Sequence, residues 1–374
     1  MKVGVPTEIK TDEYRVALTP AGARELAEAG HSVVVQAGAG LGSAIADADY
    51  SSQGAQILPD AESVFAESDM IVKVKEPQPV EVALLEPRHI LFTYLHLAPD
   101  PDLTQSLMKS GATCIAYETV EDRDGRLPLL APMSEVAGKI ATQAGAFMLE
   151  KPLGGRGILL GGVPGVAAGK VLVIGGGVVG TNAAIIALGM QAETYVFDRN
   201  IDRLRALEIE LNGAASTCYA STLEIEQMLP QADMVIGAVL VHGARAPHVI
   251  TRKQLALMKP GAVLVDVSID QGGCFETSRP TTHSDPTYEI DGVIHYCVAN
   301  MPGAVPITST YALTNATMPY MLKLATSGVQ QALAGDPGFM AGLNIAAGKI
   351  TYEPVARDQG LDYTSPQEAL ASLL

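Results

Sequence analysis

Residues 170–198 read KVLVIGGGVVGTNAAIIALGMQAETYVFD, and this stretch decides the fold. It opens with the apolar, β-branched run 171–174, which predicts a buried parallel strand. Glycines follow at the spacing G-x-G-x-x-G, and a proline-free helical pattern then runs from 178 to 189. A second short strand, 194–197, ends at Asp198. The stretch therefore predicts one βαβ unit with glycines at its first turn and a carboxylate at the tip of its second strand.

The three glycines and the acid of this unit have separate physical tasks. Gly175 allows the tight turn, Gly177 lets the backbone approach a pyrophosphate at the helix N-terminus, and Gly180 lets the helix pack closely on the strand. Asp198 can accept hydrogen bonds from both ribose hydroxyls, and its charge would repel a 2′-phosphate. A lone glycine motif is a weak signal, but here every part falls in order. We expect this stretch to bind NAD rather than NADP.

Length and composition exclude several classes of protein. A chain of 374 residues should form two domains, and 48% apolar residues with 37 glycines fit a soluble α/β protein. The net charge of −16 argues against a nucleic-acid partner, which needs basic patches. No apolar run reaches ~18 residues and the N-terminus is too polar for a signal peptide, so we expect no membrane span. The four cysteines lie far apart without a C-x-x-C motif, which is typical of reduced thiols in a cytoplasmic protein.

Strands and helices alternate on both sides of the glycine motif. Thr19 and Pro20 predict the start of the first helix, and Ser134 is expected to cap a long helix over 134–150. A glycine-bounded hairpin is expected over 154–166, and a second long helix over 307–325. The predicted strands are 2–6, 32–36, 69–75, 89–97 and 113–117 before the motif, and 233–238, 262–267 and 294–298 after it.

This alternation predicts an α/β fold with two Rossmann-like domains. The second long helix is expected to return the chain to the first domain. The nucleotide-binding domain, 129–305, would then be inserted in a discontinuous substrate and catalytic domain formed by 1–128 and 306–374.

Four polar residues stand where strands are predicted to end. In open α/β sheets ligands bind outside the carboxyl ends of the strands. Arg15 follows the first strand, Lys75 and His96 end two others, and Asp270 follows the strand 262–267. A guanidinium can clamp a carboxylate with two hydrogen bonds, a lysine adds charge, and an imidazole can exchange protons near neutral pH. Together they fit oxidation of a small acid.

Each of these residues also has a purely structural interpretation. Arg15 alone resembles a surface arginine beside Glu13, and Lys75 could lie on the solvated face of an edge strand. A single histidine such as His96 is more often structural than catalytic. Asp270 competes with Asp266, which could simply accept hydrogen bonds from neighbouring amides. The joint occurrence of all four favours function, and no histidine or cysteine cluster predicts a metal site.

Several further blocks of the sequence closely resemble the alanine dehydrogenase family from end to end. They are far more specific than the glycine motif. The blocks are MKVGVPTEIKTDEYRVALTP at 1–20, VKVKEP at 72–77, FTYLHLA at 92–98, APMSEVAG at 131–138, GGRGILLGGVPGV at 154–166, VSIDQGGCFETSRPTTHSDPTY at 267–288 and NMPGAVPITSTYALTNAT at 300–317.

The resemblance implies reversible oxidative deamination of L-alanine to pyruvate and ammonia with NAD, in a cytoplasmic homohexamer. It implies that Arg15 and Lys75 hold the substrate and that His96 and Asp270 are the catalytic acid/base residues. A serine expected in the cofactor site is replaced by Ala220, which offers only its backbone. The implied cofactor-binding residues are Ser134, Gly175, Gly177, Val178, Val179, Gly180, Asp198, Arg203, Ala220, Val239, Leu240, Val267, Ser268, Ile269, Asp270, Arg279, Val298, Ala299, Asn300 and Met301.

Other functions remain open at this point. The NAD(H)-binding component of a proton-translocating transhydrogenase resembles the same two-domain fold but processes no amino acid. A related opine- or lysine-forming dehydrogenase would need an acidic group for a second amine, and none is evident. A non-enzymatic NAD sensor would tolerate a degraded substrate site, whereas this chain carries the full set of four residues.

Overall fold

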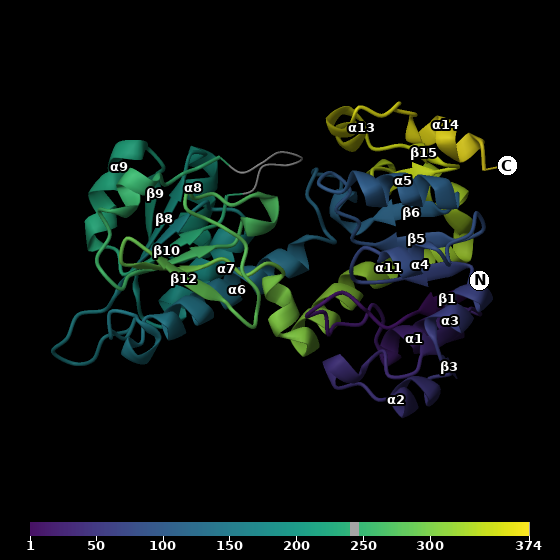
Figure 1. Ribbon diagram of the computed structural model, residues 1–374, viewed down its shortest axis with the longest axis horizontal. Coiled ribbons are helices and arrows are strands. Elements are labelled where there is room, and N and C mark those ends of the chain that lie inside the picture. Colours follow the sequence, from purple (N-terminus) through teal and green to yellow (C-terminus); the bar gives the residue numbers. More distant parts are fainter. Residues whose placement is uncertain (240–246, 374) are drawn as a thin grey trace. The chain divides into compact units, whose positions relative to one another are not determined.

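The computed structural model describes residues 1–239 and 247–373, and the chain divides into two compact units. Unit 1 comprises Met1–Met133 and Val305–Leu374, and unit 2 comprises Ser134–Ala304. A single continuous segment is thus inserted into a discontinuous unit (Figure 1). The substrate and NAD roles expected of the two units stay predictions.

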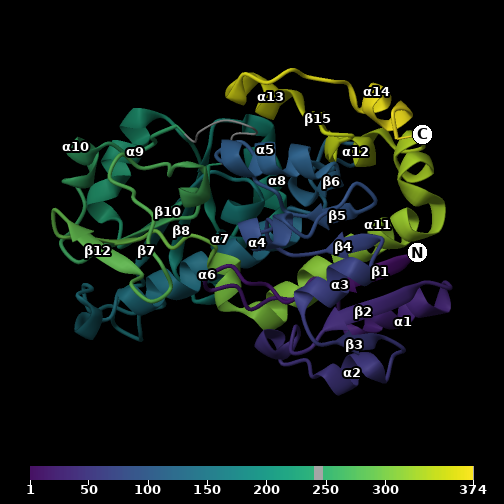
Figure 2. The same ribbon diagram turned by 45° about the vertical axis from the view of Figure 1, so that its right-hand side comes forward.

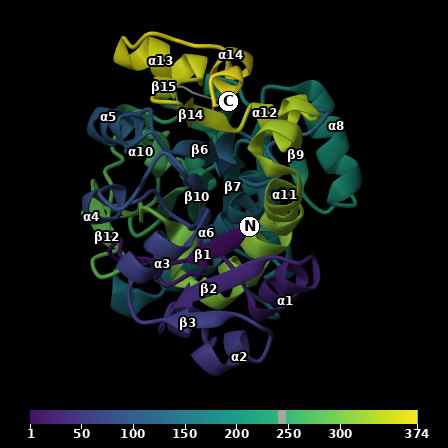
Figure 3. The same ribbon diagram turned by 90° about the vertical axis from the view of Figure 1, so that its right-hand side faces the viewer.

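Unit 1 is built on an eight-stranded sheet in the order β15-β14-β6-β5-β4-β1-β2-β3. The six strands β6, β5, β4, β1, β2 and β3 pair in parallel. At the β6 edge, β14 pairs antiparallel with β6, and β15 pairs antiparallel with β14. Figure 2 shows β1, β2 and β3 side by side, and Figure 3 shows β14 and β15 at the opposite edge. The strands are β1 (Lys2–Val5), β2 (Ser32–Gln36), β3 (Gln56–Leu58), β4 (Met70–Val72), β5 (Ile90–Thr93), β6 (Thr113–Ala116), β14 (Leu343–Ala346) and β15 (Lys349–Ile350).

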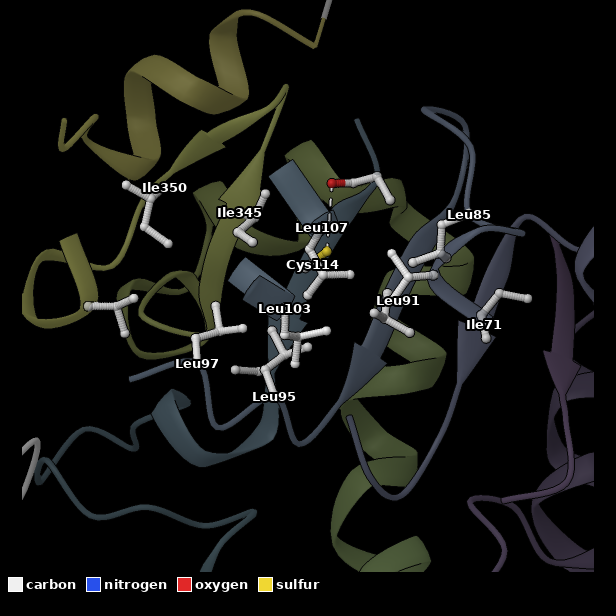
Figure 4. Packing of buried hydrophobic residues seen from close by; sticks show 14 of the residues in the cluster. Ile71, Leu85, Leu91, Leu95, Leu97, Leu103, Leu107, Cys114, Ile345 and Ile350 are labelled. Atoms are coloured by element: carbon white, nitrogen blue, oxygen red, sulfur yellow. Dashed lines mark hydrogen bonds between the residues drawn. The ribbon is translucent and has the colours of Figure 1, made fainter. Parts of the chain in front are cut away.

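Helices of unit 1 pack on this sheet and bury its apolar side chains. The helix α3 contacts β1, β2 and β3, while α5 and α14 contact β14. Figure 4 shows Leu91 of β5, Cys114 of β6 and Ile345 of β14 packed in one aliphatic core. The helices are α1 (Pro20–Glu28), α2 (Asp47–Ser51), α3 (Ala61–Glu67), α4 (Pro79–Val82), α5 (Pro101–Ser110), α11 (Pro306–Ala334), α12 (Pro337–Met340), α13 (Glu353–Gln359) and α14 (Pro366–Ala371).

Unit 2 is built on a seven-stranded sheet in the order β12-β13-β11-β10-β7-β8-β9. All neighbours are parallel except the β12–β13 pair at one edge. The strands are β7 (Lys170–Ile174), β8 (Glu193–Asp198), β9 (Ser216–Tyr219), β10 (Met234–Gly237), β11 (Val263–Asp266), β12 (Thr287–Ile290) and β13 (Val293–Tyr296). The helices are α6 (Ala131–Met148), α7 (Val178–Gly189), α8 (Ile201–Glu210), α9 (Thr222–Met228) and α10 (Arg252–Leu255).

The expected α/β fold is confirmed, and so is the first helix cap, since the Thr19 side chain accepts from Gly22 N. Ser134 is not a cap, because α6 begins at Ala131. Pro132 lies in the first turn, where its missing N–H and fixed φ are tolerated, so the helix starts earlier than expected.

Other expected elements differ in length. The strands β4 and β5 end at Val72 and Thr93, before Lys75 and His96. The expected hairpin at 154–166 is reduced to one bridge, Val163–Val166, because its glycines favour turns over strand pairing. The helix α11 extends to Ala334.

Candidate functional site

The glycine turn of unit 2, residues 175–180, is shaped by two glycines at positions where a side chain would be strained. Gly175 has a φ of 105°, a left-handed conformation that L side chains rarely adopt. A Cβ on Gly180 would lie 1.8 Å from the carbonyl oxygen of Gly175. By contrast, a Cβ on Gly177 would meet nothing within 4 Å. The first and third glycines therefore form the turn, and the second leaves open space at the start of α7, where Val178 and Val179 follow.

Asp198 and Arg203 brace the glycine turn from neighbouring elements. One Asp198 oxygen accepts from Gly176 N at 2.7 Å, and the other accepts from Asn200 N at 2.8 Å. Arg203 Nε donates to the Gly176 carbonyl at 2.6 Å, and its Nη2 donates to Thr181 Oγ1 at 2.7 Å. Each carboxylate oxygen of Asp198 has a second lone pair for a hydroxyl donor. The position expected to bind ribose thus also fixes the turn.

Asp270 lies in the short 3₁₀ helix Ile269–Gln271, on a loop that Asp266 closes at both ends. One oxygen of Asp266 accepts from Ser268 N at 2.9 Å, and the other accepts from Cys274 N at 2.9 Å and from Ser278 Oγ at 2.5 Å. Burial raises the pKa of Asp266. The structural role considered for Asp266 is therefore correct, and the exposed carboxylate is that of Asp270.

The remaining expected cofactor residues of unit 2 are spread over several loops. Val239 O accepts from Ser268 Oγ at 2.8 Å, which joins the loops after β10 and β11. Arg279 lies over the Tyr288 ring at 4.2 Å, and Ala220 N donates to Asp198 O at 3.0 Å. Leu240 lies outside the described residues. Ser134 is half-buried in α6, and the others follow β11 and β13, namely Val267, Ile269, Val298, Ala299, Asn300 and Met301.

Arg15 in unit 1 is buried, with 2% exposure, and is not a surface arginine. Its Nε and Nη2 donate to the two oxygens of Glu13 at 2.6 and 2.5 Å, and its Nη1 lies 3.0 Å from Met133 Sδ. Burial alone would raise the pKa of Glu13, but hydrogen bonds from Arg15 outweigh it, and the pKa is lowered. The same carboxylate raises the pKa of Arg15 against its burial. The guanidinium is thus charged and held in one orientation.

Lys75 is also buried, so the solvated-face interpretation is wrong. The strand β4 lies between β1 and β5, and Lys73 ion-pairs with Glu8 at 3.0 Å and Glu81 at 2.7 Å. Although burial opposes it, these carboxylates raise the pKa of Lys73. Glu8 also accepts from the backbone N of Val74 at 2.6 Å, and Thr93 Oγ1 donates to Lys75 O at 2.9 Å. Both contacts fix the backbone that carries Lys75.

His96 lies three residues beyond β5 in a left-handed conformation, with a φ of 49°. Glu118 holds this backbone by accepting from His96 N at 2.7 Å and from Leu95 N at 3.1 Å. The imidazole is 41% exposed, and its Nδ1 lies 3.7 Å from Glu76 Oε2. Strained backbone at a polar, accessible side chain is typical of functional sites.

Shared carboxylates show that Arg15, Lys75 and His96 belong to one neighbourhood. The charge of Lys75 lowers the pKa of both Glu13 and Glu76, after the larger effects of Arg15 on the first and of His96 and Lys10 on the second. We call Arg15, Lys75, His96, Glu13 and Glu76 the strand-end cluster. It combines two cations with an accessible imidazole, which suits binding of a small carboxylate and proton transfer beside it.

The sequence did not identify the carboxylates that hold these groups. Glu13 was noted only as a neighbour of Arg15, and Glu76 only as part of VKVKEP. The available signal was their position, since each lies within two residues of a candidate cation. Among the described residues no group of three histidine, cysteine, aspartate or glutamate side chains is arranged to hold a metal.

Comparison with known families accounts for both units. Residues 4–137 match "Alanine dehydrogenase/PNT, N-terminal domain", and residues 141–353 match "Alanine dehydrogenase/PNT, C-terminal domain". The chain belongs to the alanine dehydrogenase/PNT family. Within this family it is 58% identical to a protein named alanine dehydrogenase from Halomonas elongata, over 97% of this chain and 98% of that protein. It is 54% identical to alanine dehydrogenase from Mycobacterium tuberculosis, over 99% of this chain and 100% of that protein.

Two solved structures superimpose on this chain over almost its whole length. A structure named L-alanine dehydrogenase superimposes with a TM-score of 0.93 at 50% identity, covering 96% of this chain and 99% of that one. A transhydrogenase from Sinorhizobium meliloti superimposes with a TM-score of 0.81 at 22% identity, covering 94% and 99%, a likeness of fold alone. In the part of the chain that the structure describes, no helix has the length and apolar character needed to cross a membrane.

Proposed function

We propose that this chain catalyses the reversible, NAD-dependent oxidative deamination of L-alanine to pyruvate and ammonia. The observation that carries the proposal is the strand-end cluster, in which Arg15 and Lys75 lie in one neighbourhood with the accessible imidazole of His96. Membership of the family and 50–58% identity to relatives named alanine dehydrogenase support it. A transhydrogenase component is not favoured, because the likeness to that structure is only 22% in sequence.

NAD fits the glycine turn of unit 2. The open space beside Gly177 leaves room for a pyrophosphate against the N-terminus of α7. Asp198 presents carboxylate oxygens that can accept the ribose hydroxyls, and its charge disfavours a 2′-phosphate. When bound there, NAD supplies the hydride acceptor. The other residues expected to bind the cofactor in unit 2, among them Ser134 and Arg279, would hold it.

The protein residues have three tasks in the proposed mechanism. Arg15, preset by Glu13, binds the alanine carboxylate, and Lys75 adds a second positive charge. Hydride leaves Cα once the amine is neutral, and water adds to the resulting imine. His96 and Asp270 then move the protons that convert the carbinolamine into pyruvate and ammonia. Positioning and electrostatics account for most of the rate.

The experiment measures NADH formation on mixing the protein, NAD and L-alanine at alkaline pH, with glycine, L-serine and L-lysine in parallel. The proposal expects turnover with L-alanine above the other three. His96→Ala and Lys75→Ala should lose most of the turnover while NADH binding, followed by fluorescence, stays intact. Absence of any L-alanine signal, or near-normal rates in either variant, contradicts the proposal.

The assembly and location of the protein belong to the same proposal. By analogy with the family resemblance, the chain is expected to act as a cytoplasmic homohexamer. Light scattering coupled to size-exclusion chromatography measures the assembly directly. A monomeric mass with full activity would remove the hexamer from the proposal.

A further inference from the structure

The side chain of His96 is presented by a backbone that the structure holds in a strained state. Its φ of 49° lies in the left-handed region, which non-glycine residues rarely adopt. Glu118 offsets this by accepting the consecutive amides of Leu95 and His96. The ring packs against Tyr94, with 5.7 Å between the two centroids. The imidazole therefore has a defined orientation, in which its two nitrogens meet different surroundings.

Glu76 faces one of those nitrogens and is itself firmly ionised. Its Oε2 lies 3.7 Å from His96 Nδ1, and its Oε1 is ion-paired with Lys10. Among the described residues Oε2 is buried without a hydrogen-bond partner. Burial would raise the pKa of Glu76, but His96, Lys10 and Lys75 outweigh it and lower the pKa to about 2. A buried acceptor oxygen thus stands next to Nδ1, at ion-pair distance.

The other charged groups near the ring do not compete for Nδ1. Lys10 and Lys75 are cations without an acceptor atom, and both lower the pKa of Glu76. Glu118 uses its oxygens on the backbone amides, and Tyr94 donates its hydroxyl to Leu129 O at 2.6 Å. Burial raises the pKa of Tyr94 well above the working pH range, so it stays neutral. Glu76 is the carboxylate that can set the state of the imidazole.

We propose that Glu76 is a positioning residue that keeps the proton of neutral His96 on Nδ1 and leaves Nε2 to exchange protons with the substrate. This inference rests on the proposed function. In the carbinolamine step, Nε2 takes the hydroxyl proton and passes it to the amine nitrogen. The O–H electron pair then forms the carbonyl as the C–N bond breaks and ammonia leaves, so protons and electrons balance without another reactant. The transient imidazolium is stabilised by the Glu76 carboxylate.

Two substitutions at Glu76 separate charge from hydrogen bonding. Glu76→Gln removes the charge but retains an oxygen that is able to accept from Nδ1, whereas Glu76→Ala removes both. Loss of the charge removes the carboxylate that stabilises the transient imidazolium, so the acid limb of the kcat/KM profile for L-alanine oxidation moves to lower pH by about half to one unit. In Glu76→Ala the turnover should also fall, by about tenfold or more, since the reactive nitrogen is no longer fixed.

Nitrogen NMR of the imidazoles tests the inference without turnover. The seven histidines are labelled with ¹⁵N, and the His96 signals are assigned by their loss in His96→Gln. At alkaline pH the wild type and Glu76→Gln should carry the proton on Nδ1, and Glu76→Ala should shift it towards Nε2. A wild-type His96 protonated on Nε2, or an unchanged tautomer in Glu76→Ala, overturns the inference.

Two controls exclude general effects of removing a charge. Glu86→Gln is the same substitution at an exposed carboxylate that pairs with Arg88, and it should leave the limb and the tautomer unchanged. Lys10→Met removes the other partner of Glu76 and should not move the limb to lower pH. An equal downward shift in Glu86→Gln contradicts the inference. If the wild type does not oxidise L-alanine, the proposed function fails, and the NMR result still decides the role of Glu76.

Discussion

The glycine turn of unit 2 and the strand-end cluster of unit 1 both lie where parallel strands end, yet different parts of the chain build them. The turn is backbone, fixed by Gly175 and Gly180, and side chains only brace it. The cluster consists of side chains from three separate loops, each held by a carboxylate such as Glu13 or Glu76. The glycine turn should therefore be sensitive to any added side-chain atom at its close backbone contacts. The strand-end cluster should instead be sensitive to changes in the charge of its side chains. The following four predictions test this difference, from the largest expected effect to the smallest.

The largest effect is expected at the closest backbone contact of the turn. Gly180→Ala places a methyl group 1.8 Å from Gly175 O, so it should destabilise the protein by about 3 kcal/mol and abolish NADH binding. Gly177→Ala is the matched control, because its Cβ meets open space. Its free energy of unfolding should lie within about 1 kcal/mol of the wild-type value, and only NADH binding should be weakened. Thermal unfolding and NADH fluorescence measure both. Equal destabilisation by the two variants would contradict the account of the turn.

The second prediction tests charge balance in the cluster. Glu13→Gln leaves Arg15 buried without its carboxylate and should cost about 3 kcal/mol of unfolding free energy at pH 7. The pKa of Glu13 is lowered from 4.5 in the folded state. Its contribution is therefore fully present above pH 4.5 and is lost as the pH falls through the lowered folded value. Urea unfolding of both proteins from pH 7 to pH 3 should show the difference shrinking only at the acid end. If the difference in unfolding free energy between the two proteins grows as the pH falls, the proposed role of Glu13 is contradicted.

The third prediction concerns geometry at constant charge. Arg15→Lys keeps a cation but loses the planar fork that Glu13 orients. We expect kcat/KM for L-alanine to fall about 100-fold, which is about 2.7 kcal/mol, with unchanged NADH affinity. Steady-state kinetics and NADH titration measure the two. Lys10→Arg is the control, because it exchanges one cation for another at a more exposed position. It should change neither kcat/KM nor the NADH affinity.

The smallest effect is expected for the brace of the turn. Asp198→Asn keeps the shape of the side chain and one acceptor oxygen but removes the charge. Discrimination against NADPH should fall about tenfold, or about 1.4 kcal/mol, because the repulsion of a 2′-phosphate is lost. Competitive titration of NADH and NADPH measures it. If the preference is unchanged, the charge of Asp198 does not set it.

The same difference decides what could be predicted from the sequence. The turn was predicted almost residue by residue, because G-x-G-x-x-G, a short apolar strand and Asp198 occupy contiguous positions. The candidates Arg15, Lys75 and His96 could be named, but not placed. Their strands end earlier than the apolar runs indicate, and Lys73 is ion-paired with Glu8 from a distant segment as well as with Glu81 of the following helix. No local pattern predicts such contacts, nor the left-handed backbone of His96.

Segments without a strong local pattern were the other failures. The strands β3, β9, β12, β14 and β15 are only two to four residues long and were not predicted. The antiparallel β14 pairs with β6 across more than 200 residues of chain, so its partner is invisible in the local sequence. The glycine-rich stretch 154–166 was assigned a hairpin from its turn residues alone, and its structure is set by backbone freedom rather than by strand pairing.

The pairing of β14 with β6 also sets an order of synthesis and folding. Unit 2 is one continuous segment, Ser134–Ala304, and all of its strands are complete before β14 is translated. Unit 1 begins first but lacks the strand that covers β6 until Leu343–Ala346 leaves the ribosome. For that interval β6 is an open sheet edge, available to strands of other chains. The inserted unit is therefore expected to fold first on the ribosome, and β14 later completes the sheet that contains β1.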